Sequence, residues 1–442
     1  MRTRRMRLAV SSVLVTGLAG AVISVAATSA HAAAFGLQEQ STRAIGRAFS
    51  GEVADTGPES LWWNPASIAG SPAEAYGSVT GIFPNSSVTD TGSTLTLPVP
   101  PAGLTVPVGG RSKADNPILE GVVPAGGFST PIGDRFAAGL SIAAPYDFVT
   151  KYGASSFARY EGLKTRLNTA DIQLTGAMKA APWLDLGAGL DVVYTSANLE
   201  NASPNLAPGA PDGFSGVHGD GWNLGWNVGA QFHPADAKWR VGLSYRSAVV
   251  HELSGDVLVS GLGGPLAAAN MSTHGTAKFT TPWIATIGAR YPLTDKLTLN
   301  AQVQRSGWSE FKDITINLAG GAEVIPQNYK DTTSVAFGGD YALTPAVTLR
   351  AGAQFDPTPT PDVGRTVRVP DSNRWLINAG GELHLNSHLT LEGAVEYVDF
   401  RGSRVNSQTA FYQGTAAESV ADYSADASAN AVVVSGGARW RF

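Results

Sequence analysis

The chain contains no cysteine and few charged residues, and both features limit the classes of protein to which it can belong. Without cysteine it can form neither a disulfide framework nor a thiolate metal site. Charged residues make up 15% of the 442 residues, against about 25% in typical soluble domains. The formal net charge is −5 and no long basic run follows the first seven residues, so we expect no nucleic-acid partner.

Long hydrophobic runs are also missing beyond the start of the chain. Residues 1–32 combine the basic "MRTRRMR", an apolar core and small residues at Ala30 and Ala32, which is typical of a secretory signal peptide. A retained membrane anchor is the alternative, because the apolar run approaches the roughly 20 residues that span a bilayer. No later segment reaches about 18 uninterrupted apolar residues, so we expect no spanning helix in the mature protein.

The rest of the sequence alternates apolar and polar residues with period two. In "GWNLGWNVGAQFH" the apolar residues from Trp222 to Phe232 share one face, and asparagine, glycine and glutamine share the other. Such alternation predicts half-buried strands. At about 3.3 Å per residue and a tilt of about 45°, this run rises about 23 Å, close to the apolar band of an outer-membrane barrel. Strands in a soluble sandwich also alternate, but they are typically shorter.

The connections between these runs alternate between short and long. Six short turns, such as "TPIGDR" and "HPADAKW", each join two alternating runs, and seven longer loops separate the hairpins. This pattern predicts an all-β membrane protein, a fourteen-stranded antiparallel transmembrane β-barrel over residues 72–442 with seven extracellular loops and both termini in the periplasm. Its place would be the outer membrane of a Gram-negative bacterium, in contact with lipid and lipopolysaccharide. The terminal Phe442 is typical of strands that the barrel-assembly machinery recognises.

Residues 33–71 precede the first expected strand and carry helix signals. Ser41 is a capping residue ahead of helically spaced Ile45 and Phe49. In "LWWNPASI", Asn64 caps a short helix that begins at Pro65. A fourteen-stranded barrel is wider than its own side chains can fill, so we expect this segment to be a plug, or hatch, inside the lumen. A surface extension capped by the same turn is the alternative.

Several stretches resemble one family. "FGLQEQSTRAIGRAFSGEVAD" and "ESLWWNPASI" resemble the N-terminal hatch of outer-membrane long-chain fatty acid and hydrophobic compound transporters of the FadL/TodX type. "GWNLGWNVGAQF", "SGWSEF", "LRAGAQFDPTPTP" and "VPDSNRWLINAGGEL" resemble later strands in the same order. The resemblance covers essentially the whole mature chain. It implies a monomeric barrel that takes up hydrophobic molecules passively, above all long-chain fatty acids, without a cofactor or a metal.

The resemblance also implies a route for the ligand. A groove between the third and fourth long loops would capture it through Leu206, Phe214, Leu258, Leu262 and Leu266, although mutual packing of these loops would equally explain their apolar residues. The ligand would then enter a pocket beside the hatch, formed by Phe35, Leu61, Trp62, Asn64, Pro65 and Ala66. A shift of the segment near Phe35 would open the way out.

The exit would lie at a kink in the third strand, at Pro145, Tyr146 and Asp147. Proline cannot donate a ladder hydrogen bond, so Pro145 marks either the end of the strand or a gap in the wall. The family tends to have glycine where Asp147 stands, which leaves the geometry of the gap open.

A fatty acid also needs a partner for its carboxylate. The candidates near strand ends are Arg159, Arg246, Lys330 and Arg350. The resemblance favours Lys330, although most such cations are solvated or contact lipopolysaccharide. The other basic position of the family corresponds to Ser196. That departure leaves room for neutral hydrocarbon or aromatic ligands.

Other functions fit the sequence less well. No two of the seven histidines have metal-ligand spacing within a strand, and none forms an evident catalytic pair with serine, so we expect no enzyme. The main alternative is a general or hydrocarbon-selective porin, whose open lumen would carry opposed charge clusters. Inward positions here are mostly asparagine, glutamine, threonine, serine and glycine, so we expect a lumen with few charges.

Overall fold

The wall of the protein is one antiparallel sheet that closes on itself. The computed structural model describes residues 34–98, 103–206, 210–235 and 238–442, so the predicted signal peptide lies outside the described residues. The first wall strand, β1 (Glu74–Asp90), pairs with β5 on one edge and with the last strand, β23 (Ser419–Arg441), on the other. This pairing closes the barrel and removes the free edges of the sheet. The predicted fourteen-stranded fold is confirmed.

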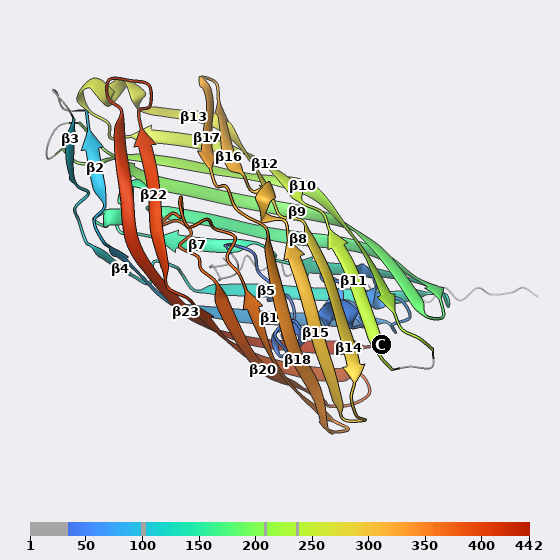
Figure 1. Ribbon diagram of the computed structural model, residues 1–442. Helices are drawn as coiled ribbons and strands as arrows, with labels where there is room; N and C mark the ends of the chain where they lie inside the picture. The colour runs from blue at the N-terminus through green and yellow to red at the C-terminus, as the bar shows by residue number, and fades with distance from the viewer. Residues whose placement is uncertain (1–33, 99–102, 207–209, 236–237) are drawn as a thin grey trace, which may run out of the picture.

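Several wall strands are interrupted, so one strand can comprise two segments (Figure 1). After β1 the wall consists of β5 (Gly121–Ile132), β6 with β7 (Phe136–Ala143, Asp147–Lys151), β8 (Lys164–Ala181), β9 (Leu184–Ser203), β10 (Gly213–Phe232), β11 with β12 (Arg240–Arg246, Val249–Ser260), β13 with β14 (Met271–Thr281, Ile284–Pro292), β15 (Leu297–Ser306), β18 (Thr332–Thr344), β19 (Val347–Asp356), β20 (Arg374–His384), β21 with β22 (Leu389–Phe400, Ser403–Phe411) and β23. The long loops carry β2 (Thr94–Leu97), β3 (Leu104–Pro107), β4 (Lys113–Asp115) and the hairpin of β16 (Asp313–Leu318) and β17 (Gly321–Pro326).

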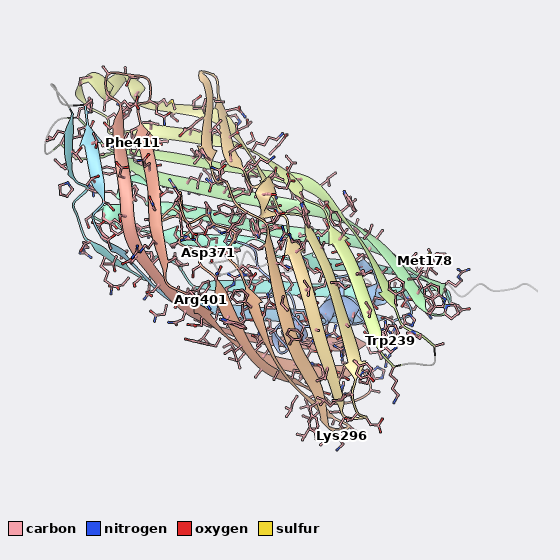
Figure 2. The ribbon with its side chains drawn as sticks, viewed as in Figure 1. Met178, Trp239, Lys296, Asp371, Arg401 and Phe411 are labelled. Carbon is pink, nitrogen blue, oxygen red and sulfur yellow. The ribbon has the colours of Figure 1, made fainter. Side chains whose placement is uncertain are left out.

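The apolar face of each strand points out of the barrel, as the alternation predicts. Trp222 and Leu224 are 62% and 68% exposed, whereas Gln231 on the opposite face is fully buried. Exposed apolar side chains would be unfavourable in water but match a lipid surround. Figure 2 shows the two ends of the barrel: Met178, Trp239 and Lys296 lie at the end with the short turns, and Phe411 lies at the end with the long loops.

The N-terminal segment runs inside this barrel, as the blue ribbon in Figure 1 shows. It forms α1 (Thr42–Ile45) and the 3₁₀ turns η1 (Glu52–Ala54), η2 (Pro58–Ser60) and η3 (Pro65–Ile68). α1 packs on β20 and β21, η1 on β11 and β14, and η3 on β8, β9 and β10. We call residues 34–71 the hatch; the predicted division at residues 71 and 72 stays a prediction. No helix within the described ranges is long and apolar enough to cross a membrane.

The hatch also bridges the seam at which the barrel closes. The amide of Thr42 donates to the hydroxyl of Tyr76 on β1 at 2.7 Å. The hydroxyls of Thr42 and Ser435, the latter on β23, lie 2.7 Å apart. One hatch residue therefore holds both the first and the last wall strand.

Inward glycines explain how closely the hatch approaches the wall. A Cβ atom on Gly187 of β9 would overlap the backbone nitrogen of Ala66, and one on Gly229 of β10 would overlap the side-chain oxygen of Asn64. The Asn-Pro-Ala turn can occupy its place only because these two strand positions lack side chains.

Substituting one of these glycines should displace the hatch. We expect Gly187→Val to raise the steady conductance in planar bilayers several-fold above that of the wild type, because valine would push the Asn-Pro-Ala turn off β9. Gly176→Val is the matched control, since Gly176 lies on the neighbouring strand with nothing within 4 Å of the added Cβ. Heat-modifiable migration in gels would show that both variants are folded. Equal conductance in the two variants would contradict this account of hatch docking.

Candidate functional site

Buried ion pairs fix the central part of the hatch to the wall. Arg47 is fully buried and pairs with Glu52 and Asp55 of the hatch, and with Asp340 of β18 at 3.3 Å. Two wall arginines complete the network: Arg290 lies 2.9 Å from Asp55 and 3.1 Å from Asp340, and Arg350 lies 2.8 Å from Asp340. Each charge of this network therefore has a partner of opposite sign, which offsets the cost of removing it from water.

A second group of ion pairs joins the network on the side of β23. Arg43 of the hatch lies 2.9 Å from Glu52 and 3.1 Å from Glu59. Arg439 of β23 lies 3.1 Å from Glu59. The expectation of a lumen with few charges was wrong, because the charges are spread over many strands and become a cluster only when the barrel closes. The carboxylates that pair with them belong partly to the hatch, so these charges fasten the hatch to the wall.

Removing the central cation should destabilise the protein. Arg47→Met would remove a cation that three buried carboxylates share and leave each of them only its other arginine partners, so we expect the free energy of unfolding to fall by about 3 kcal/mol, the lower end of the range for breaking a buried ion pair. Urea denaturation of the folded protein in detergent would measure it. The control is Arg404→Met, whose ion pair with Asp426 at 3.7 Å is exposed, and we expect its denaturation midpoint to be unchanged. The same midpoint for both variants would contradict the assigned role of Arg47.

The Asn-Pro-Ala turn docks on the wall and does not line the cavity beside Phe35 that is described below. The side-chain oxygen of Asn64 accepts from the amide of Ala66 at 2.9 Å, so the predicted cap forms. Its side-chain nitrogen donates to the carbonyls of Val53 and Ala230. Leu61, Pro65 and Ala66 are buried around this contact. Of the residues predicted for the pocket, these four lie at the interface between hatch and wall.

Trp62 lies between this interface and the pocket. Its ring is 5.4 Å from the guanidinium carbon of Arg246 on β11. The carbonyl of Trp62 accepts from Arg246 at 2.9 Å. Arg246 is itself paired with Asp171 and Asp191, at 3.0 and 2.7 Å. The two tryptophans of "LWWNP" pack edge to face at 5.1 Å.

Phe35, at the start of the hatch, is enclosed by four aromatic rings from distant parts of the chain. Ring centroids lie at 4.9 Å for Trp308, 5.1 Å for Phe311, 6.0 Å for Tyr146 and 6.4 Å for Tyr329. Trp308 begins the 3₁₀ turn η6 (Trp308–Glu310), and Tyr329 precedes β18. We call these four residues the aromatic cage. Sequence reasoning missed three of them, because "SGWSEF", which contains Trp308 and Phe311, was interpreted only as a strand, and Tyr329 stands outside the quoted motifs.

The backbone next to Phe35 pairs with the kink in the third wall strand. The amide of Leu37 donates to the carbonyl of Pro145 at 2.7 Å, and the amide of Asp147 donates to the carbonyl of Phe35 at 3.1 Å. Gly36 and Tyr146 face each other as an antiparallel bridge. The predicted kink residues thus form the site at which the start of the hatch meets the wall.

The wall is discontinuous at this kink. Pairing between β5 and β6 ends at Gly126 and Ile142, and no β5–β7 pairing occurs among the residues that the structure describes. On its other edge the strand stays paired with β8 from β6 through β7. Asp147 is buried and accepts a 2.7 Å hydrogen bond from the side chain of Asn168 on β8. Further along, the segment before β5 pairs with β7, since the amide of Leu119 donates to the carbonyl of Val149 at 3.1 Å. The third strand is therefore separated from the second only between Ile142 and Val149, where residues 35–37 meet it.

The space beside the cage is small and its one lining arginine is paired. A cavity of about 30 Å³ is lined by residues that include Gly36, Trp62, Tyr146 and Arg374, which is room for about one water molecule. Arg374 forms an ion pair with Asp356 and lies 4.0 Å from Asp371. In this conformation the cavity has no room for a larger ligand.

Lys330 is exposed and does not line this cavity. It directly follows the cage residue Tyr329, and its amide donates to the carbonyl of Pro359 at 3.0 Å. Lys312, also exposed, directly follows the cage residue Phe311 in the same way.

The third and fourth long loops contact each other through Asn205. Its side chain donates to the carbonyl of Gly261 at 3.0 Å and accepts from the amide of Gly263 at 2.9 Å. Of the predicted groove residues, Leu262 and Leu266 are buried, Leu206 and Phe214 are half-buried, and Leu258 is exposed. The loops are thus close enough to share an apolar surface, and their role in capture stays a prediction.

Comparison with known proteins decides the family. The family described as "Outer membrane protein transport protein (OMPP1/FadL/TodX)" matches residues 23–442. The chain belongs to this family. It is an outer-membrane transporter of the FadL/TodX type and not an enzyme, as predicted.

The chain is similar to individual members of this family over most of their length. A long-chain fatty acid transport protein of Escherichia coli is 26% identical over 413 residues, 85% of this chain and 89% of the relative. Outer membrane protein P1 of Haemophilus influenzae is 26% identical over 420 residues, 86% of this chain and 89% of that protein. The crystal structure of a FadL homologue from Pseudomonas aeruginosa is 22% identical in sequence and superposes with a TM-score of 0.79. The match includes 93% of this chain and 100% of the homologue. The Ralstonia pickettii toluene transporter TbuX, 20% identical, covers 93% and 99% with a TM-score of 0.62.

Proposed function

We propose that the protein takes up hydrophobic molecules passively, with long-chain fatty acids as the first candidate. The ligand is captured by the third and fourth long loops, moves to the aromatic cage and leaves sideways at the kink between β6 and β7. One observation carries the proposal: residues 35–37 both supply the ring that fills the cage and pair with the wall at its discontinuity. Emptying the cage and uncovering the gap are therefore one movement.

The cage suits an apolar ligand because it already holds an apolar group. Phe35 is 4% exposed within it. A ligand that takes its place gains about 25 cal/mol for each Å² of apolar surface that it buries, while the protein loses the contacts of Phe35. Binding thus favours the conformation in which the segment has moved, by as much as the ligand prefers that conformation.

The start of the hatch is held by hydrogen bonds and aromatic contacts, without the ion pairs that hold its centre. Two backbone hydrogen bonds join residues 35–37 to the kink, and the amide of Ala34 donates to Asp371 at 2.9 Å; each such bond contributes about 1 kcal/mol net. The central hatch is fixed by several buried ion pairs. The segment can therefore move while the rest of the hatch stays in the lumen, which favours a ligand-dependent transporter over an open porin.

The charges near the cage bear on the ligand class. Arg374 is already neutralised by carboxylates, so the cavity itself provides no free cation for a fatty acid. Lys330 lies on the surface beside Tyr329, where it would hold the carboxylate while the chain enters the cage. The names of the relatives, fatty acid transporters and a toluene transporter, support a ligand recognised mainly by its apolar part.

A disulfide between the hatch and the kink should block uptake. The chain has no cysteine, so Gly36→Cys with Tyr146→Cys creates one bridging pair, and paired antiparallel residues have the Cα separation that a disulfide needs. We expect uptake of radiolabelled oleate by cells lacking their own transporter to fall more than about tenfold on oxidation, because the open conformation is no longer populated. A reducing agent should restore it.

The control for this experiment is a disulfide elsewhere in the wall. Ser87→Cys with Ser428→Cys joins β1 to β23, where the two hydroxyls lie 3.1 Å apart. We expect its oxidation to leave uptake unchanged. Full uptake by the oxidised Gly36/Tyr146 variant would show that the segment does not need to move.

The role of Lys330 can be tested with paired ligands. We expect Lys330→Gln to weaken oleate binding two- to fivefold, about the range of an exposed charge contact, and to leave the binding of methyl oleate unchanged. Fluorescence competition with the purified protein would measure both. Lys296→Gln, at the opposite end of the barrel (Figure 2), is the control. An equal effect on acid and ester would remove Lys330 from carboxylate binding.

A further inference from the structure

A second and larger cavity lies at the short-turn end of the barrel, beyond the end of the hatch. It measures about 620 Å³ and is bounded on the hatch side by Ala69 and Gly70. The wall side contributes three cations, Arg135, Lys179 and Arg240, which we call the basic vestibule. In Figure 2, Met178 and Trp239, the neighbours of Lys179 and Arg240 in sequence, mark this end.

Two cations of the vestibule lie on the inner face of the wall, and the third, Arg135, lies in the short turn before β6. Ala177, two residues before Lys179, is buried in a cluster with Leu61 and Ile68 of the hatch. Residues two apart on a strand share a face, so Lys179 faces the lumen. Its side chain crosses Gly70 so closely that a Cβ atom there would overlap it. By the same rule Arg240 shares the face of Gly242, which abuts the backbone of Val53.

The vestibule differs from the central ion-pair network in its charge balance. Each arginine of that network has a carboxylate within 4.0 Å. Within the described ranges, neither Arg135 nor Lys179 has one, although Lys179 faces Asp185 across β8 and β9. Asp185, the single carboxylate that lines the vestibule, lies 2.8 Å from His233 and 3.9 Å from Arg240. Three cations thus line the cavity against one carboxylate.

We propose that the basic vestibule binds a small organic anion through its carboxylate or phosphate group. Arg135 and Lys179 supply the charge, and Arg240, which already donates to Gln231 at 2.7 Å, adds a further donor edge. The cavity volume lies within the range of small-molecule sites, and Ala180, Ala181 and Pro182 line it with apolar surface for the rest of the ligand. The site lies apart from the aromatic cage and does not depend on the proposed route.

Two sources could supply such an anion: a soluble periplasmic anion, or the head group of a phospholipid in the inner leaflet. Isothermal titration of the purified full-length barrel in neutral detergent would use butyrate, inorganic phosphate and dihexanoyl phosphatidylglycerol as probes. We expect the wild type to bind at least one probe, and a rise in KCl from about 50 to about 500 mM to weaken binding through screening. Tighter binding of the lipid than of phosphate would identify the head group, and equal binding of the soluble anions without the lipid would identify the soluble source.

The test variant is Arg135→Gln with Lys179→Gln, and the matched control is Lys238→Gln with Lys296→Gln. Both pairs remove two positive charges from the short-turn end, but Lys238 and Lys296 do not line the cavity. We expect the test variant to bind its probe about tenfold more weakly or worse, as the loss of charge-assisted hydrogen bonds implies, and the control to match the wild type. Absence of binding by the wild type, or an equal loss in both variants, would overturn the proposal. Unchanged heat-modifiable migration would show that the test variant is folded.

Discussion

A strand in a bilayer must pair its backbone on both edges, because lipid offers no hydrogen-bond partner. The barrel meets this requirement by pairing β1 with β23. At the kink of the third strand this pairing is interrupted, because the third strand is separated from the second between Ile142 and Val149. There the backbone of residues 35–37 provides hydrogen-bond partners. The start of the hatch thus completes the wall at this point.

The hatch therefore has two regions with different strengths of attachment. Its centre is held by charges that are costly to separate once they are buried. Its first residues are held by backbone hydrogen bonds, including that of Ala34 to Asp371, and by aromatic contacts around Phe35. In the proposed route, an apolar ligand replaces the aromatic contacts of Phe35 with its own surface and leaves the central ion pairs intact.

Strand number and orientation could be predicted because alternation repeats in every wall strand. The cap at Asn64 was also predictable, since Asn-Pro is a local signal. The ion-pair network was not, because each strand contributes only one or two charges and no short stretch looks charged. The cage was missed for a similar reason: Phe35, Trp308 and Tyr329 meet only in the closed barrel. Leu61, Pro65 and Ala66 were assigned to the pocket because sequence shows an apolar turn but not which surface it contacts.

The contacts of Thr42 with Tyr76 and Ser435 have a consequence for biogenesis. Thr42 lies near the start of the chain and is synthesised early, but its hydrogen bond with Ser435 can form only after β23 has been made. Contacts between such distant parts of a chain form slowly, because a long loop has to close first. We therefore expect closure of the barrel and final docking of the hatch to occur together and late in folding. In a nascent chain that lacks β23, Thr42 cannot yet form its hydrogen bond with Ser435.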